Sequence, residues 1–409
     1  MAIPAKCQHF DARIKALRAR QQALAQTLGK SGAGKQQVLD EIRDIGTRIA
    51  EVQQDLNACI VGNTPIPNAP SLSIVRIDVL QCVSDPGTDL ITNKRTAVRV
   101  FVSSGLPGGP PFPDGTGVVG GIDGQLEVQV LGVGQPVVLQ PLNAPVFANP
   151  LRAINPSRID HALLYELPLS LTDAALIKLS ATVMIRAQPN TQVASSAFAS
   201  FGPQLRQKIV PFLLADAFQG HPAPSMNDFR FSLEKTIARM PLAENGFIVK
   251  PPLIGTVSDD LTTYIAWTNL LLGLMTLIAV FGHDIDGLHA AMVPNGNSYA
   301  WNGLASPRVL IAAPALVSKP ASGALFAHEF AHTFGINHAG CPAEGQPNAP
   351  AFIDTTLATR LSFYGIDMSH SPHPDLKPVG TYTLMTYCGG EEKWPDGTIW
   401  KHIRVRVPN

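Results

Sequence analysis

The sequence predicts a multidomain chain with three parts: an N-terminal α-helical antiparallel coiled-coil hairpin (residues 1–62), an all-β, sandwich-like middle domain (72–200) and a C-terminal α+β domain (205–409). Three observations support this prediction. The length of 409 residues fits two or three domains of roughly 150 residues each. Coiled-coil spacing is confined to the N-terminal part, and short apolar segments between Gly/Pro turns follow it. From about residue 205, strand and helix patterns are mixed.

Composition excludes several classes of protein. The apolar content of 45% is too high for a disordered chain. The 31 basic and 31 acidic side chains cancel, so no net charge favours nucleic acid or an anionic membrane surface as a partner. The 34 Gly and 35 Pro residues favour a chain rich in β-structure and loops over an all-helical one.

Two amphipathic segments predict the helical hairpin. In each segment apolar residues alternate at spacings of three and four, which is the seam of a coiled coil. The glycine-rich turn at 29–34 reverses the chain between them. Cys7 and Cys59 lie at equal distances from that turn, so we expect a disulfide at the open end of the hairpin. The seam positions are Cys7, Phe10, Ile14, Leu17, Gln21, Leu24 and Leu28, then Val38, Ile42, Ile45, Ile49, Val52, Leu56 and Cys59.

The middle domain is predicted from a run of short strands. They are rich in Val, Ile and Leu, alternate in part, and are separated by Gly/Pro turns, as in an antiparallel sandwich or barrel. No catalytic constellation occurs among them, which indicates an accessory or binding module. Cys82 lies in the first strand and is interpreted as a buried, unpaired thiol. The predicted strands are Ile74–Val83, Thr96–Ser103, Gln125–Leu131, His161–Leu169 and Lys178–Arg186.

The C-terminal part mixes strands with helices. Leu261–Phe281 contains an uncharged stretch long enough to cross a bilayer, but its Trp, Asn, Thr and Gly residues favour a helix in the protein core. Strands are predicted at Gln207–Leu214, Gly246–Lys250 and Arg308–Ala313, and a further helix at Phe229–Arg239.

The segment Ala327–His338 carries the chemistry. His328 and His332 are four residues apart, hence on one helical face, where two imidazoles can bind one metal ion. Glu329 is placed to hydrogen-bond a water on that metal without ligating it. Gly335 can end the helix in a left-handed conformation, which lets His338 approach from another side. Three neutral nitrogen ligands with one open position predict a catalytic zinc site.

This HExxHxxGxxH pattern resembles the signature of the metzincin clan of zinc metallopeptidases, in which a Met-turn follows the motif. Leu384-Met385-Thr386-Tyr387-Cys388 lies at a compatible distance downstream. The resemblance implies that Met385 forms an apolar floor beneath the histidines. It is firm over residues 325–390 and extends to 205–409, and it assigns no subfamily.

The resemblance also bears on Tyr387. In two metzincin families a tyrosine two residues after the methionine ligates zinc at rest and hydrogen-bonds the oxyanion. Tyr387 occupies that position, and a structural role for it stays open.

Two disulfides and an exported location are expected. Cys341 follows the third histidine and Cys388 follows the Met-turn methionine at equal spacing, so both loops have to reach one metal and the two sulfurs are expected to pair. A fourth-ligand role for either is disfavoured because it would close the open position. With Cys7–Cys59, this pairing leaves Cys82 alone and predicts an oxidising compartment, although the sequence shows no signal peptide.

The leading hypothesis is a zinc endopeptidase that hydrolyses proteins or peptides, with Glu329 as general base and acid. We expect substrate to lie along an edge strand, for which Arg308–Ala313 is the candidate. The alternative is a surface-binding or adhesion protein whose zinc domain is auxiliary or vestigial. Calcium has only a weak candidate site in the segment His283–Asp286, and oligomeric state is not predicted.

Overall fold

The computed structural model describes residues 14–15, 18–19, 72–85, 88–104, 118–131, 134–281, 287–294, 299, 302–313, 322–340, 353–354, 357–358, 360–370, 374–386 and 393–407. Strands predominate over helices in these residues. The predicted fold class is therefore wrong in its helical part, because no coiled-coil hairpin is present in the described chain. Residues 14–15 and 18–19 are helical, and the rest of the predicted hairpin lies outside the described residues. Apolar residues at heptad spacing form a coiled-coil hairpin only when a second helix packs against them, and the spacing alone does not ensure that packing.

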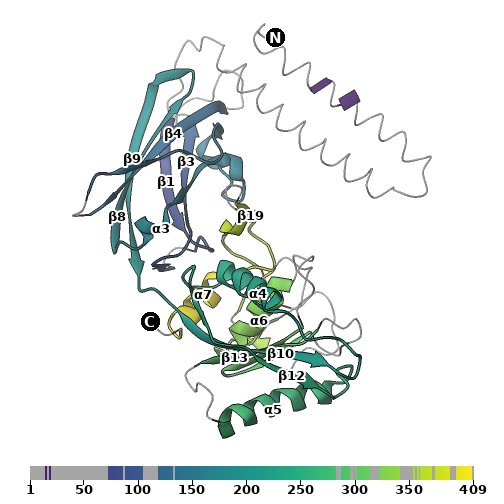
Figure 1. Ribbon diagram of the computed structural model, residues 1–409. Coiled ribbons are helices and arrows are strands. Elements are labelled where there is room, and N and C mark those ends of the chain that lie inside the picture. The colour runs from purple at the N-terminus through teal and green to yellow at the C-terminus, as the bar shows by residue number, and fades with distance from the viewer. Residues whose placement is uncertain are drawn as a thin grey trace.

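Two sheets packed face to face form the upper part of the molecule in Figure 1. The smaller is antiparallel in the order β1-β3-β7, and the larger has the order β2-β9-β8-β4-β5, with β6 also paired to β4. Alternate residues of β8 are buried, so one face of this strand supplies the core between the sheets. The strands are β1 (Leu72–Leu80), β2 (Leu90–Ile91), β3 (Thr96–Ser104), β4 (Val119–Val130), β5 (Val137–Leu139), β6 (Val146–Ala148), β7 (Ala162–Leu167), β8 (Leu176–Ile185) and β9 (Gln188–Gly202).

A mixed six-stranded sheet forms the lower part. Its order is β11-β10-β13-β15-β14, with β12 also paired to β10, and β14 alone runs antiparallel to its neighbour. The inner strands are buried along almost their whole length because helices cover both faces. The strands are β10 (Gln207–Asp216), β11 (Phe247–Val249), β12 (Leu253–Val257), β13 (Leu288–Met292), β14 (Gly303–Ser306) and β15 (Val309–Ala312).

Helices α4 (Met226–Arg239) and α6 (Ser322–His332) cover one face of this sheet, and α5 (Tyr264–Phe281) covers the other (Figure 1). The start of α4 is set by a capping box, in which Ser225 and Asp228 exchange side-chain and backbone hydrogen bonds. Phe229 of α4 meets Phe326 of α6 edge to face, with 5.7 Å between ring centroids. This contact holds the helix that carries the first two histidines against the sheet.

Helix α5 differs from the predicted core helix. Trp267 is buried against the sheet, but Ile265 and Val280 are 72% and 69% exposed. One apolar face of α5 therefore lies at the surface, and a sequence that is apolar all round could not show which side would be covered. None of the described helices is long and apolar enough to span a membrane.

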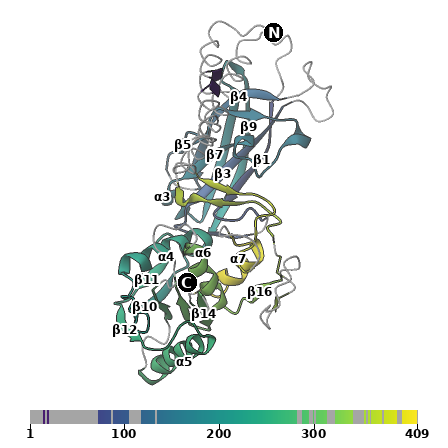
Figure 2. The ribbon, with the colours of Figure 1, turned by 90° about the vertical axis from the view of Figure 1, so that its right-hand side faces the viewer.

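The C-terminal segment returns to the upper sheets (Figure 2). Cys82 O accepts hydrogen bonds from Ile366 N at 2.8 Å and from Trp394 Nε1 at 2.9 Å. The short elements, mostly in this segment, are η2 (Leu151–Ala153), η3 (Ile159–His161), α3 (Leu169–Thr172), β16 (His338–Ala339), β17 (Ile353–Asp354), β18 (Gly365–Asp367), η4 (Met368–His370), β19 (Asp375–Lys377) and α7 (Gly397–Arg404).

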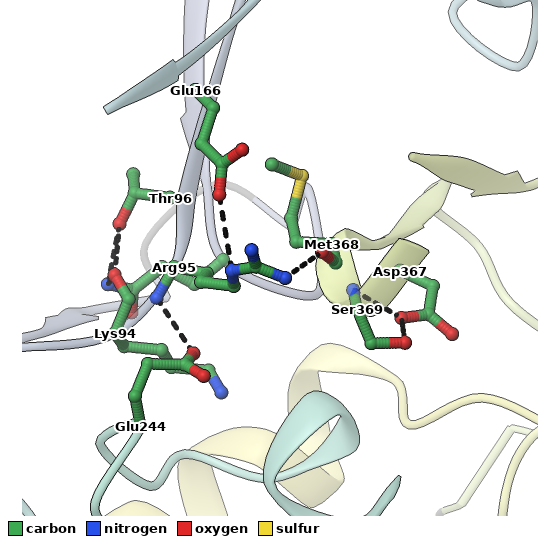
Figure 3. Close-up of polar contacts among 9 residues, drawn as sticks. Lys94, Arg95, Thr96, Glu166, Glu244, Asp367, Met368 and Ser369 are labelled. Carbon is green, nitrogen blue, oxygen red and sulfur yellow. Dashed lines mark hydrogen bonds and ion pairs between the residues drawn. The ribbon is translucent and has the colours of Figure 1, made fainter. Parts of the chain in front are cut away.

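Arg95 joins three segments that are distant in sequence (Figure 3). Its guanidinium forms an ion pair with Glu166 at 3.2 Å and donates to Met368 O at 2.7 Å, while its backbone N–H donates to Glu244 Oε1 at 3.0 Å. These contacts connect β3 and β7 to the part of the chain that carries the histidines. The predicted boundaries at 62, 72, 200 and 205 remain a prediction.

The expected exported location is also corrected. It depended on two disulfides, and the described residues contain none. Cys82 is a free thiol, fully buried, and burial raises its pKa far above the ordinary value. The other four cysteines, Cys7, Cys59, Cys341 and Cys388, lie outside the described residues. An oxidising compartment therefore has no support from the structure.

Candidate metal centre

The first two histidines lie at the C-terminal end of α6. His328 and His332 are one turn apart on this helix, which ends at His332. Gly335 has φ +78°, a left-handed conformation that costs glycine little, and its N–H donates to His332 O at 2.9 Å. The chain then reverses into β16, which begins at His338. The glycine turn therefore returns the third histidine to the first two.

The three imidazoles converge through their Nε2 atoms. The distances are 3.1 Å between His328 and His332, 3.1 Å between His328 and His338, and 2.9 Å between His332 and His338. The ring of His328 is almost fully buried, and the other two are partly exposed. The cluster is therefore open to solvent on one side.

Carbonyl groups determine which ring nitrogen carries the proton. His328 Nδ1 lies 2.8 Å from Leu384 O, and His332 Nδ1 lies 2.6 Å from Ile336 O. Because a carbonyl oxygen only accepts, both Nδ1 atoms carry the proton in the neutral rings. Both Nε2 atoms then present lone pairs to each other at 3.1 Å, which is repulsive unless a cation lies between them.

This donor set fits a metal ion. Tetrahedral zinc with Zn–N bonds of 2.0–2.1 Å separates its nitrogen ligands by about 3.4 Å. The observed 2.9–3.1 Å differs from that value by a few tenths of an ångström, which small side-chain rotations supply. Three nitrogens with a solvent-facing side suit a site that keeps an exchangeable position.

Electrostatics keep the rings neutral. Burial lowers the pKa of His328 well below its ordinary value, lowers that of His332, and lowers that of His338 to about 3. The Lys393 ammonium lowers the pKa of His328 and His338 further. A neutral imidazole has the free lone pair that metal binding requires, so the site is prepared for a cation.

Glu329 follows the first histidine and is buried. Desolvation raises the pKa of its carboxyl to about 8. The edge strand β14 packs directly on this carboxylate: a Cβ at Gly303 would lie 2.6 Å from Glu329 Cδ. A larger residue there would force the Glu329 side chain to shift, and the position of Glu329 therefore depends on β14.

Met385 and its neighbours hold two of the three histidines. Met385 is fully buried, in the same core cluster as Ala339. Leu384 O accepts from the His328 ring, and Met385 O accepts from Ala339 N at 2.9 Å, one residue after His338. The turn at 384–386 thus orients the first ligand and the strand that carries the third.

Several predicted residues lie outside the described chain. They are Tyr387, the four cysteines Cys7, Cys59, Cys341 and Cys388, and the calcium candidates His283, Asp284 and Asp286. Their roles stay predictions.

The structure adds residues that motif reading missed. Lys393 donates a hydrogen bond to Thr386 O beside the turn, and Gly303 contacts Glu329. Neither residue belongs to a motif, although a glycine in a strand is one signal of close approach by another group.

The predicted substrate edge is also corrected. Strand β15 (Val309–Ala312), within the predicted Arg308–Ala313, is internal to the sheet, and β14 is the edge strand beside Glu329.

Comparisons with known proteins give distant structural similarities. No protein-family model and no curated protein sequence matches the chain. One similar solved structure is a chaperone–substrate complex, at 10% identity and a TM-score of 0.28, covering 61% of this chain and 40% of that chain. Another is metalloproteinase-II from Bacteroides fragilis, at 11% identity and a TM-score of 0.23, covering 61% of this chain and 83% of that chain. This chain thus spans less than half of the first structure, and neither similarity supports an inference about function.

Proposed function

We propose that the chain is a zinc-dependent endopeptidase of the metzincin type. The observation that carries the proposal is the convergence of His328, His332 and His338, whose Nε2 lone pairs face each other, and the next residue after His328 is a buried glutamate. The HExxHxxGxxH spacing and the turn around Met385 support it. When bound, zinc would act as a Lewis acid toward water and the scissile carbonyl.

Glu329 is the proposed general base and acid. Its carboxylate would take the proton of the attacking water and deliver it to the leaving amine. A base has to be ionised, whereas burial raises the pKa of Glu329 to about 8. A cation held by the adjacent histidines would favour the carboxylate, because an opposite charge stabilises the ionised form.

Strand β14 is the proposed substrate platform. It is the edge of the mixed sheet in the described chain, on the side of Glu329, and its side away from β15 would pair with an extended peptide. An extended peptide bound there lies beside the carboxylate. Tyr387 is proposed as an oxyanion donor on the metzincin resemblance alone, and Met385 as the apolar floor.

Two measurements on purified full-length protein test the proposal. Metal analysis should find one zinc per chain, and casein should be cleaved by the wild type but not by Glu329→Gln, which should retain the zinc. Removing a general acid–base alone typically costs ~10²–10⁴-fold in rate. Glu234→Gln, an exposed carboxylate on α4, is the matched control and should keep full activity.

Equal cleavage by wild type and Glu329→Gln would contradict the mechanism. Zinc binding without cleavage of any substrate would favour the adhesion alternative instead.

A further inference from the structure

Strand β12 (Leu253–Val257) forms an edge of the mixed sheet opposite to β14. In the described chain it pairs only with β10, in parallel. Ala217 N donates to Val257 O at 2.9 Å, and Val257 lies opposite Asp216 in the register. In a parallel strand, the N–H and C=O of one residue point to the same side, and those of the next residue point to the other side. Val257, Gly255 and Leu253 therefore bond to β10.

Ile254 and Thr256 therefore direct their N–H and C=O groups away from the sheet. Both are exposed, and the side chain of Ile254 is 79% exposed, the highest value among the large apolar residues of the described chain. An edge with outward hydrogen-bonding groups and an exposed apolar side chain is a template for another strand.

An apolar groove lies beside this edge on the α5 face. It has a volume of about 670 Å³ and runs between the sheet and α5. Helix α5 covers the central strands and leaves β12 open, and Leu253, Leu270 and Leu277 line the resulting gap. Surface of this kind is rarely left open to water.

We propose that β12 pairs with β12 of a second copy of this chain, antiparallel and around a two-fold axis at Gly255. In that register Ile254 lies opposite Thr256 of the partner, so the residues with outward backbone groups meet each other and exchange hydrogen bonds. Leu253 lies opposite Val257 of the partner and extends the apolar surface of the groove. The absence of a Cβ at Gly255 leaves room where the strands cross the axis.

Charges at the two ends of the strand make the pairing self-complementary. Lys250 precedes β12, and Asp259 and Asp260 follow it. The two-fold axis places the end of the strand that carries Lys250 in each copy next to the end that carries Asp259 and Asp260 in the other. A parallel arrangement would place like charges together, so the charge pattern favours the antiparallel dimer.

The dimer is compatible with the candidate active site. The β12 edge and the β14 edge lie at opposite sides of the sheet, so pairing through β12 leaves Glu329 and its neighbouring strand accessible. The two sheets would join into one continuous sheet, with both copies of α5 on the same face.

Sedimentation velocity of the full chain, across roughly 1–100 μM, tests the proposal. The wild type should sediment as a dimer. Thr256→Pro removes an outward N–H without touching the bonds to β10 and should shift the chain to monomer. Arg230→Glu, an exposed charge reversal on α4, should leave the dimer intact.

A charge swap tests the register independently of Thr256→Pro. Lys250→Glu and Asp259→Lys should each weaken the dimer by roughly tenfold, because each places like charges together at both ends of the interface. An equimolar mixture of the two variants should form heterodimers with restored affinity.

A wild-type monomer at 100 μM, or a mixture that stays as weak as the single variants, would overturn the proposal. Circular dichroism of each variant confirms that loss of the dimer is not loss of the fold.

Discussion

Replacing Gly303 by alanine changes the candidate active site without removing any functional group. The new Cβ would lie 2.6 Å from Glu329 Cδ, whereas unbonded carbon atoms keep about 3.6 Å. Because β14 is held by its ladder with β15, the carboxylate has to move by about 1 Å. A displacement of that size at a reacting group costs roughly 10²-fold in rate.

The assay is peptide hydrolysis under saturating and limiting substrate, with zinc content measured on the same samples. We expect kcat to fall roughly 10²-fold while zinc content stays at the wild-type level and KM changes little, since the three histidines are not displaced. Overpacking should also lower the free energy of unfolding by about 1–3 kcal/mol.

Gly273→Ala is the matched control, because its Cβ would meet no atom within 4 Å. This variant lies in α5, where alanine is the better helix former, and it should keep full activity. Wild-type kcat in Gly303→Ala would refute the positioning of Glu329 by β14. Loss of zinc together with activity would show that the substitution damages the metal centre instead.

Three further predictions concern the metal centre and the fold. His338→Ala should lose most zinc binding by metal analysis, whereas His221→Ala should retain it; full zinc occupancy in the first variant would remove His338 from the ligand set. Burial lowers the pKa of Lys94 from 10.5, so the folded protein releases this proton before the unfolded chain and wild-type stability should rise with pH up to about 10.5. In Lys94→Met that rise should be lost in urea titrations at pH 8–10, and identical pH profiles would show that burial does not lower the pKa of Lys94. Ser225→Ala removes the capping box of α4 and should lower the free energy of unfolding by about 1 kcal/mol, and an unchanged urea midpoint would contradict the cap.

The sequence located much of the local structure. The predicted strand Thr96–Ser103 corresponds to β3 at Thr96–Ser104, and the predicted helix Phe229–Arg239 lies within α4 at Met226–Arg239. Alternation of apolar residues is a local signal, which acts within a few residues and can be read without the fold. The capping box that starts α4 three residues before the predicted Phe229 was not part of the prediction.

The sequence did not show which strand lies at the edge of the sheet or which face of a helix lies at the surface. Arg308–Ala313 reads as a strand, but β15 is internal because Gly303–Ser306 pairs with it antiparallel. Similarly, α5 is apolar all round, and only its packing on the sheet shows that Ile265 is at the surface. The position of a strand in a sheet depends on long-range pairing, which apolar periodicity does not encode.

The export inference failed for a related reason. Cys7 and Cys59 are equally far from a turn, and Cys341 and Cys388 follow His338 and Met385 at equal spacing. Such spacing indicates a disulfide only if the segments between the cysteines fold as expected. The described chain contains one cysteine, Cys82, which is a buried free thiol, and its backbone carbonyl accepts a hydrogen bond from Trp394 Nε1.

For the candidate site, the sequence by itself determined the three histidines, the adjacent glutamate and the glycine turn, because a helical repeat and a left-handed glycine place them within eleven residues of chain. Only the tertiary structure decided how they are oriented. Leu384 O selects the tautomer of His328, Gly303 limits the position of Glu329, and Lys393 adds positive charge nearby. These groups lie 26 to 65 residues from the residues they act on, and contacts across such distances arise from the packing of the sheet and loops rather than from local sequence pattern.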